Sequence, residues 1–535
     1  MSDLKLFEQV CLAMSDPAFY PHPVSKLERL ETHISTVFLT GDFVYKLKKP
    51  VDFGFLDYTE LATRRRMCEV EVALNQRLSH DVYLGIVAVG CMGGAYHYGD
   101  SGEVVEYAVK MTQLPDEFCL SNLIPAGKVG LDEMLCLGRF LAGFYAGSER
   151  GPQIDVYGGR EVLELNTEEN FRQLEPFVGS LLSKDRLDFV MESSRAFFRD
   201  CGSYFKRRIA DRRICDGHGD LRTEHVYFFD RIQIIDCIEF NERFRYGDTA
   251  IDLAFLHMDI ERLGRSDLSL ALLNGYMESS GDYGIYTMLD FYSCYRAIVK
   301  IKVSCLTTTE LEEGAGKKTT EELAVRYLDL AFRYAVQFAR LTLWVFCGLP
   351  GTGKSTLAIR LHEIFGINLI RSDDVRKEIP EHHAHEGPVS YGTGRYRQDM
   401  RGLVYGRLLL MAQEELERGR PVILDATFSK QKWREEAVRL AQDLDANILF
   451  VECTCSEDAL LDRLGGRTQG NDGHSDARAE HLPGFLAEFE ALQELGTDRL
   501  IRIDTEKDIE TNIRTILTSA YEKKRAQVER VVEQL

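Results

Sequence analysis

The pattern of apolar and polar positions changes once along the chain. In the first part, alternating runs predict a β-hairpin at residues 33–51, and helical spacing predicts a helix at residues 59–79. Residues 130–210 are mainly helical in pattern, and the polar segment at residues 307–322 predicts an exposed loop. The first part, residues 1–340, is therefore predicted to form an α+β domain.

Strands and helices alternate in the remainder of the chain, residues 341–535. The apolar run LTLWVFCG is followed by a glycine-rich turn and a helix, and strand-like runs recur at NLIRSDD, RPVILDAT and NILFVECT. Helical segments lie between these runs. This alternation predicts a parallel sheet with crossover helices, and hence an α/β domain.

The glycine-rich turn carries the most specific motif of the chain. GLPGTGKS, residues 348–355, matches G-x-x-x-x-G-K-[ST] fully, between a predicted strand and a predicted helix. In such a loop, backbone N–H groups face phosphate oxygens, the lysine neutralises the β- and γ-phosphates, and the final hydroxyl ligates Mg²⁺. We therefore predict that it binds ATP or another nucleoside triphosphate with Mg²⁺, which Ser355 would ligate. The residues predicted to contact the nucleotide are Gly348, Gly351, Thr352, Gly353, Lys354, Ser355 and Thr356.

Acidic residues at two later strand ends are candidates for the chemical step. Asp373, in RSDDVR, is predicted to take a proton from an acceptor hydroxyl, and Arg376 to hold a phosphate of the substrate. The alternative for this pair is a helix cap with a surface arginine. Asp425, in ILDATF, is a candidate second acid near Mg²⁺.

A glycine-rich polar segment, residues 463–478, follows the last of these strands. It predicts a mobile lid that brings Arg463 or Arg467 onto the transferred phosphate.

These motifs resemble those of the zeta-toxin-like and polynucleotide-kinase-like P-loop kinases. The resemblance is carried by GLPGTGKST, RSDDVR, ILDATF and SDA and covers roughly residues 341–500. It implies that Asp373 is the base and that Arg376 binds a substrate phosphate. That family phosphorylates varied hydroxyls, including those of nucleotide sugars and 5′ ends of nucleic acids, so the motifs leave the acceptor open. Residues 341–500 contain 19 Lys and Arg against 26 Asp and Glu, which disfavours a long polynucleotide.

A second set of candidate residues surrounds CDGHGDLRTEHVYFFD, residues 215–230. The stretch resembles the catalytic loop H-G-D-x-x-x-x-N of the aminoglycoside phosphotransferases and their protein-kinase-like relatives. The resemblance implies that Asp220 orients or deprotonates an acceptor hydroxyl and that Asp236, beyond the predicted hairpin, binds Mg²⁺. It also implies that Asp248 and Asp252 are structural acids that support the loop.

The resemblance extends upstream and covers roughly residues 30–340. It implies that Lys46 is the phosphate-binding lysine and that Glu71, on the predicted helix after it, is the ion-pair partner of Lys46, with Glu69 as second choice. The chain is identified as a member of the bacterial proteins that fuse an aminoglycoside-phosphotransferase-like domain to a P-loop kinase domain.

Two features depart from the kinase-like pattern. His225 stands where asparagine binds the second Mg²⁺; it stays a candidate ligand, although imidazole binds Mg²⁺ poorly. No G-x-G-x-x-G precedes Lys46, and GCMGGAYHYG, residues 90–99, is typical of a hairpin turn. The first domain is therefore either a kinase with weak nucleotide binding or one metal, or a kinase-like binding or regulatory module.

Composition restricts the binding partners and the cellular location that we expect for the protein. The net charge of −20 disfavours nonspecific binding to nucleic acid and to anionic lipid. No apolar stretch reaches the roughly 18 residues that span a bilayer, and the N-terminus does not have the pattern of a signal peptide. The 13 cysteines form no C-x-x-C pair, which predicts reduced thiols and a cytoplasmic location.

The sequence thus predicts an ATP- and Mg²⁺-dependent phosphotransferase that acts on a hydroxyl. A bifunctional small-molecule or nucleotide kinase is the first hypothesis. The alternatives are a kinase of nucleic-acid 5′-hydroxyl ends and a nucleotide-operated switch whose first domain binds a partner. The expected partners are a small-molecule or nucleotide acceptor, or a nucleic-acid 5′ end, with no membrane; the oligomeric state is open.

Overall fold

The computed structural model describes most of the chain. The described residues are 3–54, 56–379, 398–466 and 479–532. All 13 cysteines lie within these ranges, and each is a free thiol, as predicted. None of the helices in the described ranges is long and apolar enough to cross a membrane.

The chain forms two compact units and passes between them three times. Unit 1 consists of Met1–Glu169 and Ser203–Gly281, and unit 2 of Asn170–Gly202 and Asp282–Leu535. These units are defined by packing and differ from the domains predicted from the sequence, residues 1–340 and 341–535. The predicted domain boundary stays a prediction.

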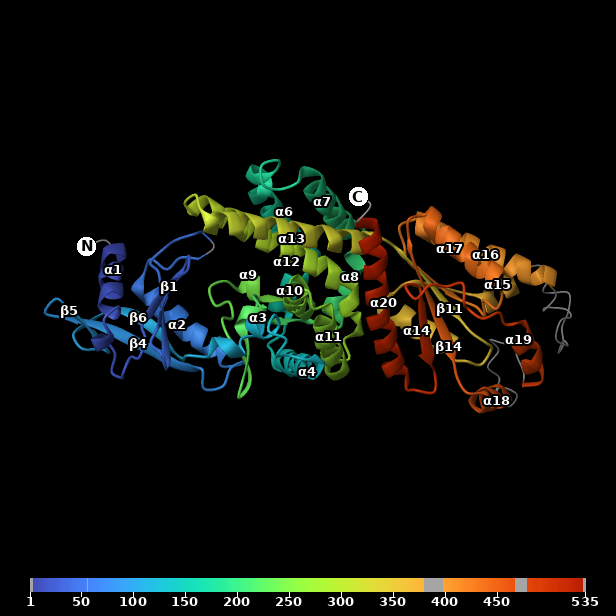
Figure 1. Ribbon diagram of the computed structural model, residues 1–535, viewed down its shortest axis with the longest axis horizontal. Coiled ribbons are helices and arrows are strands. Elements are labelled where there is room, and N and C mark those ends of the chain that lie inside the picture. Colours follow the sequence, from blue (N-terminus) through green and yellow to red (C-terminus); the bar gives the residue numbers. More distant parts are fainter. Residues whose placement is uncertain (1–2, 55, 380–397, 467–478, 533–535) are drawn as a thin grey trace. The chain divides into compact units, whose positions relative to one another are not determined.

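Unit 1 begins with a six-stranded sheet in the order β1-β2-β3-β6-β4-β5 (Figure 1). Neighbouring strands of this order are antiparallel, and β2 with β3 forms the hairpin that was predicted at residues 33–51. The strands are β1 (Glu28–Glu31), β2 (Ser35–Leu39), β3 (Phe43–Lys48), β4 (Tyr83–Met92), β5 (Ala95–Tyr98) and β6 (Glu103–Thr112). The segment at residues 90–99 is a hairpin turn, as predicted.

Two helices cover opposite faces of this sheet. Apolar residues of α1 (Asp3–Met14) pack with Tyr45 and Leu47 of β3, whereas Cys68 of α2 (Leu61–Asn75) packs with side chains of the other face. Because side chains alternate along a strand, Lys46 and Lys48 of β3 lie on the α2 face.

The remainder of unit 1 is helical around two small two-stranded sheets. Strand β7 (Ile214–Asp216) pairs with β10 (Tyr246–Asp248), and β8 (Val226–Phe229) pairs with β9 (Arg231–Ile234). The connection from β7 to β8 carries Asp220, and Asp236 follows β9. The helices are α3 (Leu120–Leu123), α4 (Leu131–Gly147), α5 (Pro152–Asp155), α6 (Arg160–Leu174, which continues into unit 2), α8 (Gly202–Ala210), α9 (Glu242–Arg245), α10 (Thr249–Arg262) and α11 (Ser266–Ser280).

Unit 2 contains the parallel five-stranded sheet that the second part of the sequence predicted. Its order is β12-β13-β11-β14-β15, and β11, at its centre, is buried along its whole length. The strands are β11 (Thr342–Cys347), β12 (Asn368–Arg371), β13 (Val422–Asp425), β14 (Asn447–Thr454) and β15 (Leu500–Asp504).

Helices cover both faces of the parallel sheet, which explains why its strands are continuous apolar runs. Figure 1 shows α14 (Lys354–Phe365) and α20 (Ile509–Val532) on one face and α16 (Gln398–Glu417) and α17 (Gln431–Asp443) on the other. The short helices α15 (Ser372–Glu378), α18 (Glu457–Gly466) and α19 (Leu482–Glu488) complete this part of unit 2. The predicted fold class, a kinase-like α+β part followed by a P-loop α/β part, is confirmed.

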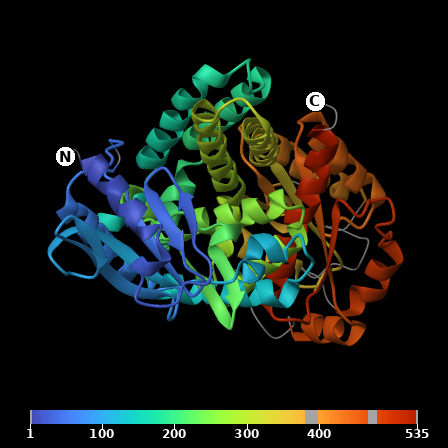
Figure 2. The same cartoon turned by 60° about the vertical axis from the view of Figure 1, so that its left-hand side comes forward.

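Three further helices belong to unit 2 although they precede the sheet in sequence: α7 (Lys184–Asp200), α12 (Leu289–Glu310) and α13 (Ala315–Ala339). Figure 2 shows α12 and α13, in yellow-green, as neighbouring coils. The loop predicted at residues 307–322 is wrong, because only residues 311–314 separate the two helices. The hydroxyls of Thr319 and Thr320 donate to the carbonyls four residues earlier, so these polar residues are satisfied inside a helix.

Candidate active site

The turn between β11 and α14 has the backbone that its glycines permit. Gly348 has φ +135°, and a Cβ there would lie 2.4 Å from the carbonyl oxygen of Cys453 on β14. Gly353 has φ +84° and immediately precedes α14. Because both conformations are unfavourable for other residues, the tight turn that places Lys354 and Ser355 in the first turn of α14 depends on glycine.

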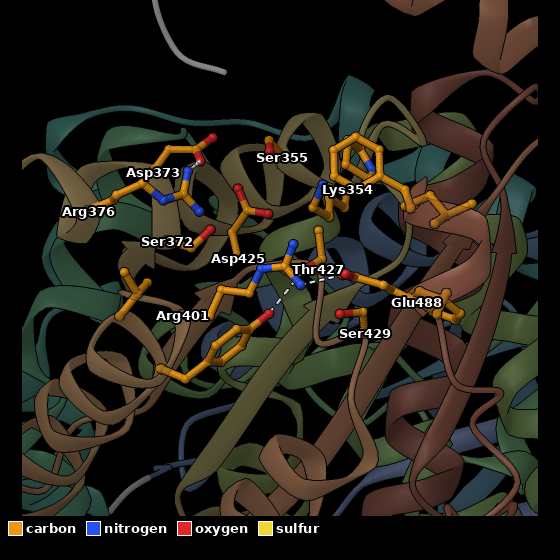
Figure 3. Close-up of a pocket in the computed structure, with 16 residues that line it drawn as sticks. Lys354, Ser355, Ser372, Asp373, Arg376, Arg401, Asp425, Thr427, Ser429 and Glu488 are labelled. Carbon is orange, nitrogen blue, oxygen red and sulfur yellow. Dashed lines mark hydrogen bonds and ion pairs between the residues drawn. The ribbon is translucent and has the colours of Figure 1, made fainter. Parts of the chain in front are cut away.

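A cavity lies at the carboxyl end of the sheet, beside this turn (Figure 3). The space between its walls, including the part open to solvent, is about 870 Å³. Its lining comes from the turn, α15, α16, the segment after β13, and the region of α19. The lining residues are Leu349, Pro350, Lys354, Ser355, Ser372, Asp373, Arg376, Arg401, Val404, Tyr405, Asp425, Thr427, Ser429, Phe485, Glu488 and Phe489. The structure therefore brings five predicted site residues, Lys354, Ser355, Asp373, Arg376 and Asp425, to one cavity.

Asp373 and Arg376 lie one turn apart on α15 and form an ion pair. Arg376 Nη1 is 2.9 Å from Asp373 Oδ1, and both side chains are mostly buried. The N-cap of α15 is Arg371 rather than Asp373. Asp373 thus faces the cavity with a cation beside it, which is an arrangement suited to a base whose orientation is fixed by its neighbour.

Asp425 is the last residue of β13, and only one of its two carboxylate oxygens has a hydrogen-bond partner among the described residues. Oδ2 is 3.4 Å from Nε of Arg371, whereas Oδ1 is buried and has no hydrogen-bond partner among the described residues. Leaving a carboxylate oxygen buried without a partner is costly, and carboxylate and hydroxyl oxygens are ligands of hard cations. Asp425 and the Ser355 hydroxyl in the same cavity therefore fit a Mg²⁺ ion bound together with nucleotide phosphates.

The predicted lid arginines have different outcomes. Arg463, on α18, donates to the hydroxyl of Thr505 at 2.9 Å and to its carbonyl at 2.8 Å. The side chain of Thr505 lies 3.3 Å from where a Cβ of Gly353 would be, so Arg463 is close to the P-loop without being one of the described residues that line the cavity. Arg467 lies outside the described residues.

Sequence reasoning missed the wall opposite the P-loop. Arg401 and Tyr405 come from α16, and Arg401 forms an ion pair with Glu488 of α19 (Figure 3). Tyr405 shares a hydrogen bond with the Thr427 hydroxyl at 3.0 Å and accepts one from the Phe428 N–H at 2.8 Å. Their only signal in the sequence is helical spacing, because Arg401 and Tyr405 are four residues apart, as are Phe485 and Phe489.

A second cluster of predicted residues assembles in unit 1. Lys46 Nζ is 2.5 Å from Asp236 Oδ1 and 2.9 Å from Glu71 Oε1, so Glu71, and not Glu69, is the partner in the structure. Asp236 has φ +64°, a strained left-handed conformation. Burial alone would raise the pKa of Asp236, but Lys46 and His225 hold it well below its ordinary value. The carboxylate is therefore ionised at neutral pH.

The predicted catalytic loop carries a basic residue that sequence reasoning did not single out. Arg222 binds both carboxylate oxygens of Asp220, with distances of 3.0 Å from Nε and 2.8 Å from Nη2. His225 Nδ1 donates to the Asp220 carbonyl at 2.8 Å, and its Nε2 is 3.6 Å from Asp236 Oδ2. His225 thus lies next to the carboxylate that was predicted to bind metal, and Arg222 is the missed residue of this site.

The loop itself is fixed by groups that stay uncharged or buried. Asp252 accepts hydrogen bonds from the N–H groups of His218 and Gly219 at 2.7 and 2.9 Å, so it supports the loop as predicted. Asp248 instead pairs with Arg208 and caps α10. Burial lowers the pKa of His218 to about 3, which keeps the ring neutral, with its Nε2 donating to the Ile235 carbonyl at 3.0 Å.

Comparison with known proteins gives relatives that match most of the chain. Residues 343–492 match the profile of a family described as an AAA domain. A protein of Mycobacterium tuberculosis (strain H37Rv) and one of Mycobacterium bovis, both described as uncharacterized, are each 34% identical to it over 490 residues. The match covers 90% of this chain and 94% of each relative.

Solved structures of kinases match parts of the chain. A gluconokinase from Sinorhizobium meliloti is 19% identical, with 37% of this chain and 95% of that chain covered and a TM-score of 0.26. A choline/ethanolamine kinase family protein from Mesorhizobium loti is 13% identical, with 61% and 98% covered and a TM-score of 0.37.

The profile match at residues 343–492 agrees with the predicted P-loop domain, and the two-part fold is the one that the sequence predicted. By its identity and coverage, the chain belongs to the family of these mycobacterial proteins.

Proposed function

We propose that the P-loop domain transfers the γ-phosphoryl group of a Mg²⁺-bound nucleoside triphosphate to a hydroxyl group of a small-molecule or nucleotide acceptor. One observation carries this proposal: Lys354 and Ser355 of the P-loop line the same cavity as Asp373. A phosphate site and a candidate base thus share one space, as phosphoryl transfer requires.

The residues of the cavity divide the chemical work. Lys354 neutralises the β- and γ-phosphates. Asp373 takes the proton of the acceptor hydroxyl while the hydroxyl oxygen forms a bond to the γ-phosphorus, and the bond from that phosphorus to the leaving nucleoside diphosphate breaks. Ser355 and Asp425 would hold Mg²⁺, which supplies positive charge next to the phosphates. Arg376 keeps the carboxylate of Asp373 oriented.

The wall formed by α16 and α19 is the candidate acceptor subsite. It offers the Arg401–Glu488 pair as hydrogen-bonding groups and Phe485 and Phe489 as apolar surface. Each arginine of the cavity lies within ion-pair distance of a carboxylate, so the wall carries both donors and acceptors. Such a surface suits a small acceptor with several hydroxyl groups.

Radiolabelled phosphate transfer tests the proposal on the full chain. The acceptors are sugars, nucleosides, nucleotide sugars and oligonucleotides with a 5′-hydroxyl, and the variants are Lys354→Ala and Asp373→Asn. Asp374→Asn is the matched control, because Asp374 is the next residue of α15, is half-exposed and does not line the cavity. Loss of transfer in both variants with retention in the control supports the proposal. Hydrolysis of ATP without transfer to any acceptor would overturn it in favour of a nucleotide-operated switch.

A second phosphotransferase site in unit 1 is favoured by a separate observation. Lys46 is within ion-pair distance of both Glu71 and Asp236, in the arrangement that positions nucleotide phosphates and metal in kinases. Asp220→Asn in the same assay tests it: transfer to one acceptor lost only in Asp220→Asn, and to another only in Asp373→Asn, would establish two activities. If Asp220→Asn changes no transfer reaction, unit 1 is a binding module.

A further inference from the structure

A second lysine lies behind Lys46 in unit 1, in a cluster of buried charges. Lys48 is two residues further along β3, on the same face of the strand. Its Nζ is 2.7 Å from Glu71 Oε2 and also contacts Glu239 Oε1. The side chains of Lys48 and Glu71 are 0% exposed, so these charges depend entirely on each other.

Tyr58 completes the surroundings of Glu239. Its hydroxyl donates to Glu239 Oε1 at 2.8 Å, and its ring lies 5.2 Å from the Lys48 ammonium. Burial alone would lower the pKa of Lys48, but Glu239 and Glu71 raise it well above the ordinary value. Lys48 is therefore a permanent cation at neutral pH.

Glu71 bridges the two lysines, one with each oxygen. Lys46 Nζ lies 2.9 Å from Oε1 as an ion pair, and Lys48 Nζ donates a hydrogen bond to Oε2 at 2.7 Å. If Lys46 turns towards a phosphate, Glu71 still has a counter-charge. With Lys46 as its only partner, the same movement would leave a buried carboxylate without a counter-charge, which is strongly unfavourable.

The cluster also joins three elements of the candidate site. Lys48 ends the strand that carries Lys46, Glu71 lies on α2, and Glu239 follows Asp236 by three residues. The two lysines face three carboxylates, and the carboxylate left in excess is the one that reaches solvent, since the Asp236 side chain is 44% exposed. A nucleotide-bound cation at Asp236 would balance the cluster.

We propose that Lys48, Glu239 and Tyr58 are positioning residues that hold Glu71 and the segment of Asp236 in the nucleotide-binding arrangement before a nucleotide arrives. This inference rests on the proposal that unit 1 binds a nucleotide. The ligand it prepares for is a nucleoside triphosphate with one divalent cation.

The test measures Mg²⁺-dependent binding of a fluorescent ATP analogue to the full chain carrying Lys354→Ala, which weakens the P-loop site. Binding lost on adding Lys46→Ala defines the unit 1 site. The double variant Lys48→Met/Glu239→Gln removes both charges of the pair together, so that neither is left buried alone. We expect it to weaken unit 1 binding by about tenfold, the usual effect of removing groups that orient a ligand-binding residue.

Arg64→Met/Glu106→Gln is the matched control. Arg64 and Glu106 form another buried pair between α2 and the sheet, with distances of 2.9 and 3.0 Å. Arg64 also donates to the backbone carbonyl of Tyr58 at 2.9 Å, so this pair adjoins the cluster without sharing its ion pairs, which makes it a stringent control. We expect this control to change the affinity less than twofold. Equal affinity in the Lys48 double variant and its parent would overturn the proposal, as would an equal loss in the control.

Hydrogen exchange of the nucleotide-free chain distinguishes the positioning role of these residues from the proposal that unit 1 binds a nucleotide. We expect faster exchange at residues 234–240 in the Lys48 double variant than in the control. Unchanged exchange there would overturn preassembly even if affinity falls. If the Lys354→Ala parent shows no binding that Lys46→Ala removes, the unit 1 nucleotide site is wrong, and the positioning role falls with it.

Discussion

The two candidate sites would hold phosphate by different means. In unit 2 the P-loop offers backbone N–H groups, and its shape depends on glycines at left-handed φ within a few consecutive residues. In unit 1 the corresponding charge comes from Lys46, which is held by Glu71 and Asp236 from two other elements. A loop of the first kind is fixed by local conformation, whereas a cluster of the second kind is fixed only when the whole unit folds.

The largest expected effect distinguishes the base of the P-loop site from its neighbour. Asp373→Asn is expected to lower the rate of phosphoryl transfer by about 10²- to 10⁴-fold, the contribution of a positioned general base. Asp374→Asn should stay within about twofold of the parent. Steady-state transfer kinetics on the acceptor identified for the P-loop domain provide the measurement, and equal losses in the two variants would refute the role of Asp373.

The next effect concerns stability and sets the two lysines of β3 against each other. Lys48→Met leaves Glu71 and Glu239 without their shared cation and is expected to destabilise unit 1 by about 3–5 kcal/mol. Lys46→Ala should cost clearly less, because Lys48 still neutralises Glu71 and Asp236 reaches solvent.

Hydrogen exchange in urea measures this difference in unit 1. Both tryptophans of the chain, Trp344 and Trp433, lie in unit 2, so their fluorescence serves as an internal control that should not change. A larger loss of stability in Lys46→Ala than in Lys48→Met would contradict the bridging role of Glu71.

A smaller effect is expected for the cation of the P-loop site. Asp425→Asn should raise the Mg²⁺ concentration needed for half-maximal transfer by about 10- to 100-fold, with a smaller change in the rate at saturating Mg²⁺. A titration of transfer with Mg²⁺ checks this prediction. Asp445→Asn is the control, because Asp445 is an exposed acid just before β14. An unchanged Mg²⁺ requirement would show that the unpartnered oxygen of Asp425 does not serve the cation.

The smallest effect is the acid sensitivity that His218 gives to unit 1. His218 has a folded pKa of about 3 and an unfolded pKa near 6.5, so between these values the unfolded state binds one more proton. Stability should therefore rise with pH across this window and fall by about 1.4 kcal/mol per unit on acidification below 6.5. Unfolding followed from pH 7 to 5 measures the slope, which His218→Asn should remove. None of the described residues that line the P-loop cavity is a histidine.

The same contrast explains how much the sequence could predict. The P-loop and the acids at the ends of β12 and β13 were predictable, because a complete local motif and a parallel sheet place them together. Arg401 and Glu488 were not, because the packing of α16 and α19 brings them to the cavity and no short motif marks them. Arg463 was predicted to contact the transferred phosphate, whereas in the structure it donates a hydrogen bond to Thr505.

In unit 1 the predictable residues were those that match a known pattern. Lys46, Glu71 and Asp236 lie together, whereas the bridging geometry of Lys48 and Glu239 depends on contacts across 191 residues of sequence, which no periodicity reveals. The failure at residues 307–322 has the opposite cause. Polar composition suggested a loop, but threonine hydroxyls bonded within the helix allow α12 and α13 to continue almost to each other.

The interleaving of the two units has a consequence for how this protein can be taken apart. Helices α12 and α13 precede the P-loop strand, yet they belong to unit 2, where α13 packs against α20. The ring of Tyr286, just before α12, lies 5.7 Å from that of Tyr521 on α20. A fragment that starts at β11 would lack these helices and expose the side of α20 that they cover. A fragment cut at the start of the P-loop strand is therefore expected to be less stable than one that begins before α12.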